Sequence, residues 1–569
     1  MPFTSQHSEV AVVGAGPVGL SAALQLARRG IAVAVLEQRA TPSDLPRAHV
    51  VNARTMELFR QWGVAEAVRA KGLPAHLSTS FGWLSSLAGQ EIATLDYIAE
   101  DAAELSSPER LCSCPQDLIE EVLREALLAQ PTATLTYGAE VTGYAVVGDG
   151  ARLTVRQADG TRELAVRYVI GADGGRSRTR ELAGLALERS VPLGRRVNIY
   201  FRSDLTAVTR GRPHILWTIM SAATQGIFIA LDGATRWVYS VELAPGEEVA
   251  DYPAERCREL LRLAVGDPDL EPEILATFLW RVDMAMAERF AAPPLFLAGD
   301  AAHQFPPMGG FGMNSGIQDA HNLAWKLAAV LRDGASPALL DTYDAERRPV
   351  AAYNAEQCMD NARKQMEAAA LMSSPEVLAL MASAAGAELR AQFAAGVRMQ
   401  QPEFHSQGQQ FGFVYRSAAV VSDGTTAPTS TIADYHATAS PGARLPHLRL
   451  VHADGTKPST IEVAGERWTL LVAGPAAAWG GTAWESTAWE AAVAAKHGLT
   501  DLRVVAVGAG TDWPEAVPGA FRTAYELDEG GAALIRPDGH VAARWRSLPD
   551  DPAAALARVA DQVLGTAML

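Results

Sequence analysis

The stretch "SEVAVVGAGPVGLSAALQLARRGIAVAVLEQR", at residues 8–39, decides the fold. It opens with a short apolar run, Val10–Val13, followed by the glycine pattern G-x-G-x-x-G and by a helical pattern with apolar residues three and four positions apart. A second apolar run at residues 31–36 ends at an acidic residue, Glu37. This order of strand, glycine turn, helix, strand and acid predicts a nucleotide-binding βαβ unit in a parallel sheet.

The three glycines of this turn have separate tasks in such a unit. They permit a tight turn, a close approach by a pyrophosphate, and close contact of helix and strand, while the helix N-terminus supplies unpaired N–H groups. Glu37 stands where an acidic side chain accepts hydrogen bonds from a ribose diol. The predicted dinucleotide contacts are Gly14, Gly16, Pro17, Val18, Gly19, Glu37, Gln38 and Arg39. This stretch leaves open whether the dinucleotide is NAD or FAD.

The composition is that of an ordinary globular protein of 569 residues, with 48% hydrophobic and 20% charged residues. The net charge of -16 provides no basic surplus for phosphate, which argues against nucleic acid or an anionic membrane as the main partner. The N-terminus lacks the basic region of a signal peptide, and no apolar run reaches about 18 residues, so we expect a soluble cytoplasmic protein. The four cysteines include no C-x-x-C pair, and we expect neither a disulfide framework nor a metal site.

A second glycine-rich stretch is "PLFLAGDAAHQFPPMGGFGMNSGIQDAHNLAWKL" at residues 294–327. It predicts a buried strand at 294–298 and a long helix over 315–332 with one apolar stripe. Ser315 and Gln318 have the spacing of a capping box, which predicts the first turn of this helix. A second polar strand end therefore faces a second helix N-terminus.

That strand end and helix start can hold a flat, electron-accepting ring. Asp300 can accept hydrogen bonds from sugar-alcohol hydroxyls, and the glycines let main-chain N–H groups reach the ring without obstruction by a Cβ. The positive end of the helix dipole would stabilise the anion of a reduced isoalloxazine. This stretch therefore favours FAD, the alternative being a glycine-rich loop that merely turns a corner.

Three segments in this order resemble the FAD-dependent aromatic hydroxylases of the p-hydroxybenzoate hydroxylase superfamily. They are "VVGAGPVGL…LEQR", "YVIGADGGRSRTR" at residues 168–180, and "FLAGDAAHQFPPMGGFGMNSGIQDAHNLAWKLAAVL". The tail "LLDTYDAERRPV" at residues 339–350 is similar to the phenol, chlorophenol and polyketide hydroxylase branch. The resemblance implies an α/β FAD-binding Rossmann-like domain with an inserted antiparallel-sheet substrate domain, and an FAD that reaches from the first glycines to the last ones.

The resemblance also implies roles for single residues. Asp173 of the Asp-Gly motif would serve FAD and the nicotinamide donor, Arg47 would lie near flavin and pyrophosphate, and Gln116 would match the family's ribityl glutamine. For Arg47 and Gln116, a surface salt bridge and an ordinary helix start are the alternatives. The residues expected at the reacting part of the flavin are Arg47, Pro306, Pro307 and Gly309. The remaining expected FAD contacts are Arg47, Gln116, Asp173, Gly299, Asp300, Pro307, Gly310, Gly312, Met313 and Asn314.

The activity that the resemblance implies is hydroxylation of an aromatic ring. NAD(P)H reduces the flavin, O2 adds at its C4a atom, and the resulting hydroperoxide hydroxylates an activated ring. The protein supplies a dry pocket, a stabilised flavin anion and a positioned phenol or phenolate. No second nucleotide-binding motif is present, so NADPH or NADH should bind transiently. His303 is expected to be a hydrogen-bonded scaffold residue rather than a base, and a homodimer stays open.

Four short runs between the Asp-Gly and Gly-Asp motifs predict an antiparallel sheet, because they are rich in β-branched and aromatic residues. They are "RRVNIYFRSDL", "PHILWTIMSA", "GIFIALDG" and "RWVYSVEL". In the resembled family such a sheet covers the flavin and lines the substrate pocket. Side chains alternate between the faces of a strand, so each aromatic has an even chance of facing the pocket. The aromatics expected to contact substrate are Trp83, Trp217, Phe228, Trp237, Tyr239 and Phe305.

The last part of the chain predicts a separate domain. Its order of strand, helix, strand, hairpin and helix resembles the thioredoxin-like domain of the family's longer members. No cysteine follows Cys358, which excludes thiol redox work for it. The expected ranges are 1–75, 106–182 and 285–400 for FAD binding with a helical extension, 76–105 and 183–284 for substrate binding, 401–440 for a linker, and 441–569 for the thioredoxin-like domain.

Other functions fit parts of this pattern. A flavin halogenase shares the first motif, but its W-x-W-x-I-P motif is absent. An NAD-dependent dehydrogenase would leave the second glycine stretch unexplained. A non-catalytic flavin-binding or aromatic-ligand-binding protein stays open, as do epoxidation and Baeyer–Villiger oxygenation by the same flavin chemistry. Met308 and Phe311 add bulk beside the expected flavin, and we favour a polycyclic phenol or polyketide over a simple phenol.

Overall fold

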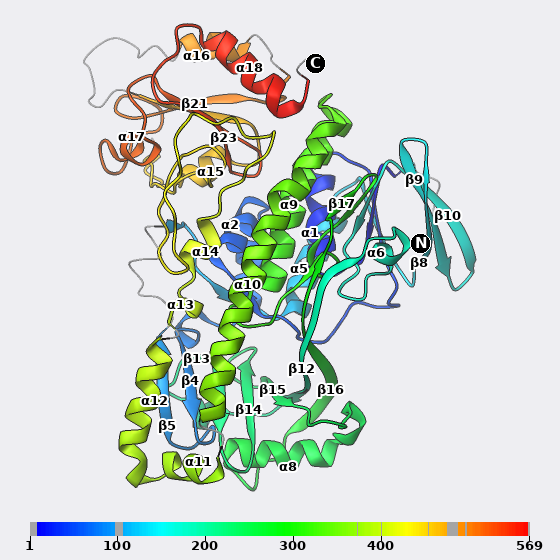
Figure 1. The fold of residues 1–569 in the computed structure, drawn as a ribbon, viewed down its shortest axis with the longest axis vertical. Helices are drawn as coiled ribbons and strands as arrows, with labels where there is room; N and C mark the ends of the chain where they lie inside the picture. Colours follow the sequence, from blue (N-terminus) through cyan, green and yellow to red (C-terminus); the bar gives the residue numbers. More distant parts are fainter. Residues whose placement is uncertain are drawn as a thin grey trace.

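The structure is a computed structural model that describes residues 8–96, 106–371, 374–399, 401–452, 454–474, 487–494 and 498–566. Figure 1 shows three parts along its long axis. A sheet domain with α8 and α12 occupies one end, an α/β domain with α1 and α9 lies in the centre, and the domain of α16 to α18 occupies the other end. Among the described residues, no helix has the length and apolar character needed to cross a membrane.

A six-stranded sheet with the order β17-β18-β11-β1-β2-β7 forms the centre of the α/β domain. Its strands are β1 (Val10–Val13), β2 (Val33–Glu37), β7 (Ala133–Tyr137), β11 (Tyr168–Gly171), β17 (Ala291–Ala292) and β18 (Leu295–Leu297). All pairs are parallel except β17 with β18, and the inner strands are buried apolar runs, as in a sheet covered on both faces. The first strand is confirmed, whereas the second begins two residues later than predicted because Ile31 still bonds to the end of the preceding helix.

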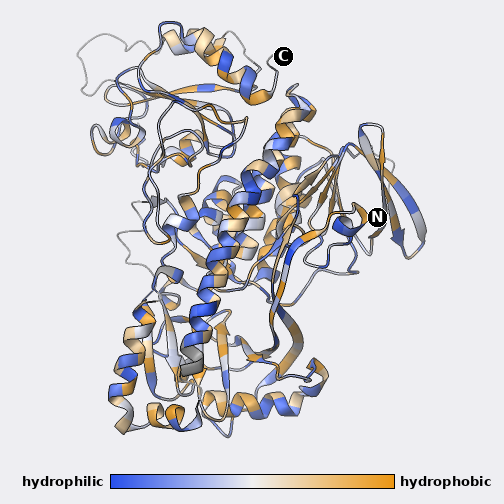
Figure 2. Cartoon of the chain, in the orientation of Figure 1, coloured by the Kyte–Doolittle hydropathy of each residue, from blue (hydrophilic) through white to orange (hydrophobic). Residues whose placement is uncertain are grey.

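Helices cover this sheet, and α9 lies against α1 beside it (Figure 1). The helices of this domain are α1 (Pro17–Arg28), α2 (Ala53–Gln61), α3 (Ala65–Lys71), α5 (Gln116–Leu128), α6 (Arg178–Leu182), α9 (Phe311–Arg332) and α10 (Thr342–Leu371). Two small sheets flank the domain, one of β8 (Glu140–Val147), β9 (Gly150–Gln157) and β10 (Gly160–Val166), the other of β3 (Val50–Val51) and β6 (Cys112–Ser113). Figure 2 shows hydrophobic residues concentrated on the central strands and hydrophilic ones along much of α10.

Helix α9 begins four residues earlier than the sequence predicted. Gly309 and Gly310 have φ angles of 104° and 70°, so the chain turns there, and Phe311 is already helical. Ser315 is therefore a buried interior residue, and its hydroxyl accepts a hydrogen bond from Asn354 at 3.1 Å. The predicted capping box is wrong because glycine geometry, not a side-chain cap, starts this helix.

An eight-stranded sheet with the order β19-β16-β12-β15-β14-β13-β4-β5 forms the second domain. Its strands are β4 (Ser80–Leu84), β5 (Glu91–Asp96), β12 (Leu187–Arg202), β13 (His214–Met220), β14 (Gln225–Ala230), β15 (Arg236–Glu242), β16 (Glu273–Ala287) and β19 (His303–Gln304). Neighbouring strands are antiparallel except β13 with β4, which confirms the predicted antiparallel sheet. Helix α8 (Ala254–Val265) covers one face, while α11 (Pro375–Ala382) and α12 (Ala387–Met399) pack near β5 against the other.

A four-stranded sheet with the order β21-β20-β22-β23 forms the C-terminal domain. Its elements are α15 (Thr460–Ala464), β20 (Thr469–Ala473), α16 (Thr487–Ala494), β21 (Arg503–Val507), α17 (Ala520–Tyr525), β22 (Ala532–Ile535), β23 (Val541–Trp545) and α18 (Pro552–Leu564). Strand β20 pairs in parallel with β21 and antiparallel with β22. The segment that precedes this domain contains the short helices α13 (Gln401–Phe404) and α14 (Gln407–Phe411).

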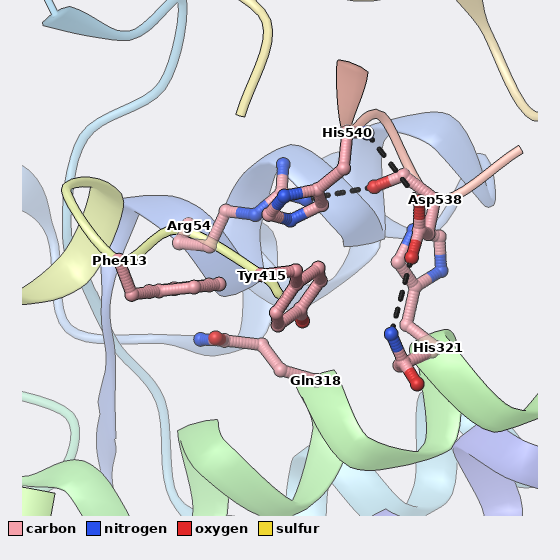
Figure 3. Close-up of a pocket in the computed structure, with 8 residues that line it drawn as sticks. Arg54, Gln318, His321, Phe413, Tyr415, Asp538 and His540 are labelled. Carbon is pink, nitrogen blue, oxygen red and sulfur yellow. Dashed lines mark hydrogen bonds between the residues drawn. The ribbon is translucent and has the colours of Figure 1, made fainter. Parts of the chain in front are cut away.

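Buried ion pairs join the C-terminal domain to the helices of the α/β domain. Glu346 accepts hydrogen bonds from Arg536 at 2.6 Å and from Lys326 at 2.8 Å, and all three side chains are buried. A cavity at this junction, whose lining side chains are drawn in Figure 3, has a volume of about 10 Å³, enough for one water molecule. It is lined by Arg54, Gln318, His321, Asn322, Phe413, Tyr415, Asp538 and His540. This cavity is far too small for an aromatic substrate.

Candidate active site

Two of the three glycines in the first turn are required by the protein itself. A Cβ on Gly14 would lie 2.3 Å from the carbonyl oxygen of Ala172, and a Cβ on Gly19 would lie 2.0 Å from the carbonyl oxygen of Gly14. A Cβ on Gly16 would meet only a carboxylate oxygen of Glu120, 4.0 Å away. Gly16 is the N-cap of α1 and has an extended backbone that any residue can adopt. The fold therefore leaves space beside Gly16 in which a ligand can approach the helix N-terminus.

The glycines at the start of α9 also differ in whether the protein leaves room for a side chain. A Cβ on Gly316 would lie 2.5 Å from a Val18 methyl carbon and 2.8 Å from the Cα of Gly299. Gly316 therefore lets α9 pack directly on the first glycine turn. A Cβ on Gly312, in contrast, would meet no atom within 4 Å. The start of α9 therefore leaves space for a ligand at Gly312, whereas Gly316 is in close contact with the rest of the protein.

Asp300, Arg47 and Glu120 bring three charges to the space between these two helix starts. Burial raises the pKa of Asp300, while the charges of His303 and Arg47 oppose this, yet the side chain of Asp300 keeps contact with solvent. Arg47 is exposed, and it acts electrostatically on Glu120 as well as on Asp300. The structure therefore brings together the predicted Arg47 and Asp300 and adds Glu120, which the sequence analysis missed.

Glu37 closes the first turn through its carboxylate. One oxygen accepts a hydrogen bond from the N–H of Ala15 at 2.8 Å, and the other accepts from the N–H and Nε of Arg39 at 2.9 Å. Burial alone would raise the pKa of Glu37, but these hydrogen bonds outweigh burial and hold the pKa below its ordinary value. The carboxylate is therefore an anion that retains lone pairs for ligand hydroxyls.

Asp319 fixes the two residues that flank the Asp300 turn. Its Oδ2 atom accepts a hydrogen bond from the N–H of Gly299 at 3.2 Å and lies 2.6 Å from Nε2 of His303, so His303 is hydrogen-bonded, as expected. Its Oδ1 atom accepts from Nε of Arg347 at 2.8 Å. Burial would raise the pKa of Asp319, but His303 and Arg347 outweigh burial and hold it low. Neither Asp319 nor Arg347 was predicted from the sequence. Asp319 is a charge beside the apolar stripe of a predicted helix, which was an available signal, whereas Arg347 stands in the polar run DAERRP, where a charge is ordinary.

Asn314 uses its side chain within the protein. Its Nδ2 atom donates to the carbonyl oxygens of Val50 at 2.9 Å and Gly310 at 2.7 Å, and its Oδ1 atom accepts from the N–H of Asn52 at 3.0 Å. The side chain therefore ties the segment before α2 to the start of α9. Only the main chain of Asn314 remains free for the predicted cofactor contact.

Asp173 and Gln116 are also engaged with neighbouring groups. Asp173 accepts hydrogen bonds from the hydroxyl of Ser177 at 2.5 Å and the N–H of Thr179 at 2.9 Å, so it orders the Asp-Gly loop. Gln116 begins α5 and donates to Glu120 at 2.8 Å, one helical turn further on. Gln116 thus lies at the same helix end as the carboxylate next to Gly16.

The other predicted residues of the second stretch lie on the loop that leads to α9. Pro306 is buried, whereas Pro307, Gly309 and Met313 are half-buried. The ring of Phe305 stacks on His303 with 4.7 Å between the ring centroids. In the first unit, Gln38 is exposed at the end of β2.

Four of the predicted substrate aromatics lie on the wrong face of the sheet. These are Trp217, Phe228, Trp237 and Tyr239, each at most 2% exposed. They form one core cluster with Cys257, Leu261 and Val265 of α8. The expectation that they contact substrate is therefore corrected, because paired strands place all four on the side covered by α8. Trp83 lies on the opposite face, where it meets Phe393 of α12 edge-on.

The face opposite α8 carries a continuous row of paired residues across six strands. Its members are Trp83, Thr218, Ile227, Ser240, Asn198 and Phe278, in the order of their strands. Four of them are only half-buried: Trp83, Thr218, Ile227 and Phe278. Next to this row, Tyr200 bonds to Arg236, and Arg236 pairs with Asp117 of α5 at 3.1 Å. This face therefore meets the helix end that carries Gln116.

Comparison with known proteins identifies the family to which the chain belongs. Residues 7–358 match the family described as "FAD binding domain", and residues 438–567 match the family described as "Aromatic-ring hydroxylase, C-terminal". The chain belongs to the FAD-dependent aromatic-ring hydroxylases. Its cofactor is FAD, and it is a monooxygenase of aromatic compounds.

Relatives of this hydroxylase act on both small and large aromatic compounds, according to their names. It is 34% identical to a 4-methyl-5-nitrocatechol 5-monooxygenase of Burkholderia sp, over 96% of each chain. It is also 34% identical to aklavinone 12-hydroxylase RdmE of Streptomyces purpurascens, over 98% of each chain. The crystal structure of the flavin-dependent monooxygenase PieE in complex with FAD and substrate has a TM-score of 0.90 at 32% identity, covering 99% of this chain and 100% of that one.

FAD fits the residues present at the two glycine turns of the hydroxylase. Gly16 and Gly312 leave open space at two helix N-termini, where pyrophosphate and a reduced ring system are stabilised. Glu37 and Asp300 supply acceptors for sugar hydroxyls at the ends of two strands. When bound, FAD takes up electrons from NAD(P)H and passes them to O2.

Proposed function

We propose that this hydroxylase binds FAD across both glycine turns and hydroxylates a polycyclic phenol on the sheet face opposite α8, with NADPH or NADH as reductant. The observation that carries the proposal is the open space at Gly16 and Gly312, the two glycines of these turns that neither a close protein contact nor a positive φ angle requires. The pyrophosphate then lies at Gly16, the ribityl chain at Asp300, and the flavin ring at Gly312.

The proposed reacting region is the loop between β19 and α9. Pro306, Pro307 and Gly309 give it a backbone with few N–H groups and side chains, which suits contact with a flat ring. Arg47 brings a positive charge to the same region through its interaction with Asp300. This charge favours the anionic reduced flavin and attracts the negatively charged nicotinamide donor.

The length of the half-buried row supports a polycyclic substrate. The row crosses six strands, which at about 4.8 Å between strands makes it roughly 24 Å long. A single phenol ring would cover only a small part of it. The similarity to an enzyme named for aklavinone supports the same size class.

The remaining expectations concern the whole chain. We infer that the C-terminal domain is thioredoxin-like, which its strand order and the parallel pairing of β20 with β21 support. All four cysteines precede this domain and are buried, so thiol redox work is excluded for it and a structural or subunit-contact role remains. The domain ranges, the cytoplasmic location and the homodimer stay predictions.

Incubation with isotope-labelled O2 tests the proposal. Purified holoenzyme is supplied with NADPH or NADH and with simple or polycyclic phenols, and the products are examined by mass spectrometry. The proposal expects one labelled oxygen atom in a hydroxylated polycyclic product. Substrate binding without NAD(P)H consumption would favour the non-catalytic alternative, and a labelled epoxide or lactone would favour the other oxygenations.

A further inference from the structure

Asn198 is the one amide in the row on the sheet face opposite α8, which is called the open sheet face from here on; α11 and α12 pack against its end at β4 and β5. It lies on β12 between Val197 and Ile199, which are both fully buried in the core under α8. Successive residues of a strand point to opposite faces, so Asn198 lies on the face opposite α8. Its cross-strand neighbours are Ser240 on β15 and Phe278 on β16.

The side chain of Asn198 is buried without a partner for its oxygen. The residue is 3% exposed, and Oδ1 accepts no hydrogen bond from any described part of the chain. A buried amide oxygen without a partner costs stability, and native proteins seldom retain one. Its presence on the open face points to a hydrogen-bond donor that arrives with a ligand.

Arg196 lies two residues before Asn198 and therefore on the same face. It donates to the hydroxyl and the carbonyl oxygen of Ser240, each at 2.9 Å. No carboxylate lies within ion-pair distance of it in the described ranges. Burial lowers the pKa of Arg196, and the attraction of Glu242 only partly offsets it. The guanidinium thus carries a positive charge that no neighbouring anion neutralises directly.

The flanking residues suit a flat aromatic ligand. Phe278 and Ile227 are half-buried and occupy the same row on either side of Asn198 and Ser240. Rings and aliphatic side chains of this kind stack on an aromatic plane, while a few polar groups fix its orientation. The polar groups available in this row are the Asn198 amide and the Ser240–Arg196 pair.

We propose that Asn198 and Arg196 bind the oxygen-bearing edge of the aromatic substrate. The Asn198 oxygen accepts a hydrogen bond from a ring hydroxyl, and Arg196 pairs with an ionised phenolic oxygen beside it. The ligand class is therefore a polycyclic phenol with two neighbouring oxygen substituents. This assignment rests on the proposed function, since it places the substrate on the open sheet face.

The test compares wild-type holoenzyme with Asn198→Leu, which keeps the branched shape and the number of heavy atoms of the side chain. The probes are alizarin, which has two adjacent hydroxyls, and anthraquinone, which has none. Binding is followed by the change in flavin absorbance, and thermal stability by the unfolding temperature. We expect Asn198→Leu to weaken alizarin binding about tenfold, to leave anthraquinone binding unchanged, and to keep or raise the unfolding temperature.

A second variant tests the charge, and a control variant tests the stability argument. Arg196→Gln should abolish the gain in alizarin affinity that accompanies ionisation of its hydroxyl as pH rises. Asn354→Leu removes a buried amide that is hydrogen-bonded to Ser315 and Gln409, so it should lower the unfolding temperature.

Two results would overturn the inference. One is a lower unfolding temperature in Asn198→Leu with alizarin binding intact, which would make the amide structural. The other is a wild-type enzyme that does not distinguish alizarin from anthraquinone. The proposed function fails separately, if no phenol of any size is hydroxylated.

Discussion

In the two glycine turns of this hydroxylase, some glycines are required by the packing of the protein, and others leave space for a ligand. Gly14 and Gly19 meet main-chain atoms so closely that no Cβ fits, whereas Gly16 and Gly312 face open space. A glycine pattern in a sequence does not reveal this difference, because all motif glycines look alike. The distinction singles out two positions where substitution should affect the cofactor alone.

At Gly16 we predict a loss of cofactor binding without a loss of fold. Gly16→Ala should keep the unfolding free energy of the apoprotein within about 1 kcal/mol of wild type, since its Cβ meets open space. Its dissociation constant for FAD should rise at least about tenfold, because the methyl group occupies the pyrophosphate's approach. Gly19→Ala is the matched control and should destabilise the apoprotein by about 3 kcal/mol or more. Equal FAD affinity in Gly16→Ala and wild type would contradict the assignment.

Single residues could be predicted where one short segment carries the whole signal. Glu37 and Asp300 follow directly from strand ends and glycine spacing. Glu120, Asp319 and Arg347 could not be predicted in this way, because their partners come from other helices and strands. Their roles depend on packing that no local pattern encodes.

At the scale of elements, strand alternation decides which aromatics can meet a substrate. The sequence correctly predicts the strands around Trp217, Phe228 and Trp237, yet it does not show which face α8 covers. The strand register places these side chains on the same face of the sheet. Once α8 covers that face, all of them are excluded from contact with substrate together. The predicted first residue of α9 was wrong because the backbone turn at Gly309 and Gly310 determines where the helix begins.

Two neighbouring residues of β14 should therefore respond differently to truncation. Phe228→Ala should cost about 3 to 5 kcal/mol of unfolding free energy, because the side chain is fully buried under α8. Ile227→Ala should cost less stability and raise KM for the aromatic substrate several-fold, because Ile227 is half-buried on the open face. Denaturant titration and steady-state kinetics measure the two effects. A raised KM in Phe228→Ala with normal KM in Ile227→Ala would reverse the assignment of faces.

At the scale of the whole molecule, the segment expected as a linker is a packed part of the structure. Its Gln409 side chain donates to Asn354 of α10 at 3.0 Å, and Arg347 of α10 donates to Tyr415 at 3.1 Å. The polar composition of residues 401–440 predicted a linker, and composition does not reveal buried partners of this kind. The order of the three parts along the chain was predictable, since each has its own strand and helix pattern.

Acid should destabilise the junction between the α/β and C-terminal domains. Burial lowers the pKa of His447 from 6.5 to about 4 and that of His540 from 6.5 to about 3. Below pH 6.5 these histidines are protonated in the unfolded chain but remain neutral in the folded chain. The free energy of unfolding therefore decreases as the pH falls, until the pH reaches the lowered pKa values of the folded state. Each histidine contributes at most about 1.4 kcal/mol per pH unit.

The measurement is the unfolding free energy between pH 7 and pH 4 for wild type and His447→Gln. The variant should show a shallower decline, while His76→Gln, at an exposed position, should follow the wild-type curve. Identical curves for all three proteins would show that burial of His447 does not contribute to acid sensitivity.

The most direct test of the account is the anaerobic reduction of bound FAD by NADPH and by NADH, followed by flavin absorbance with and without phenols. We predict that one donor reduces the flavin and that a polycyclic phenol accelerates this step more than a simple phenol does. Flavin that neither donor reduces, with or without any phenol, would contradict the assignment of this protein as a working aromatic hydroxylase.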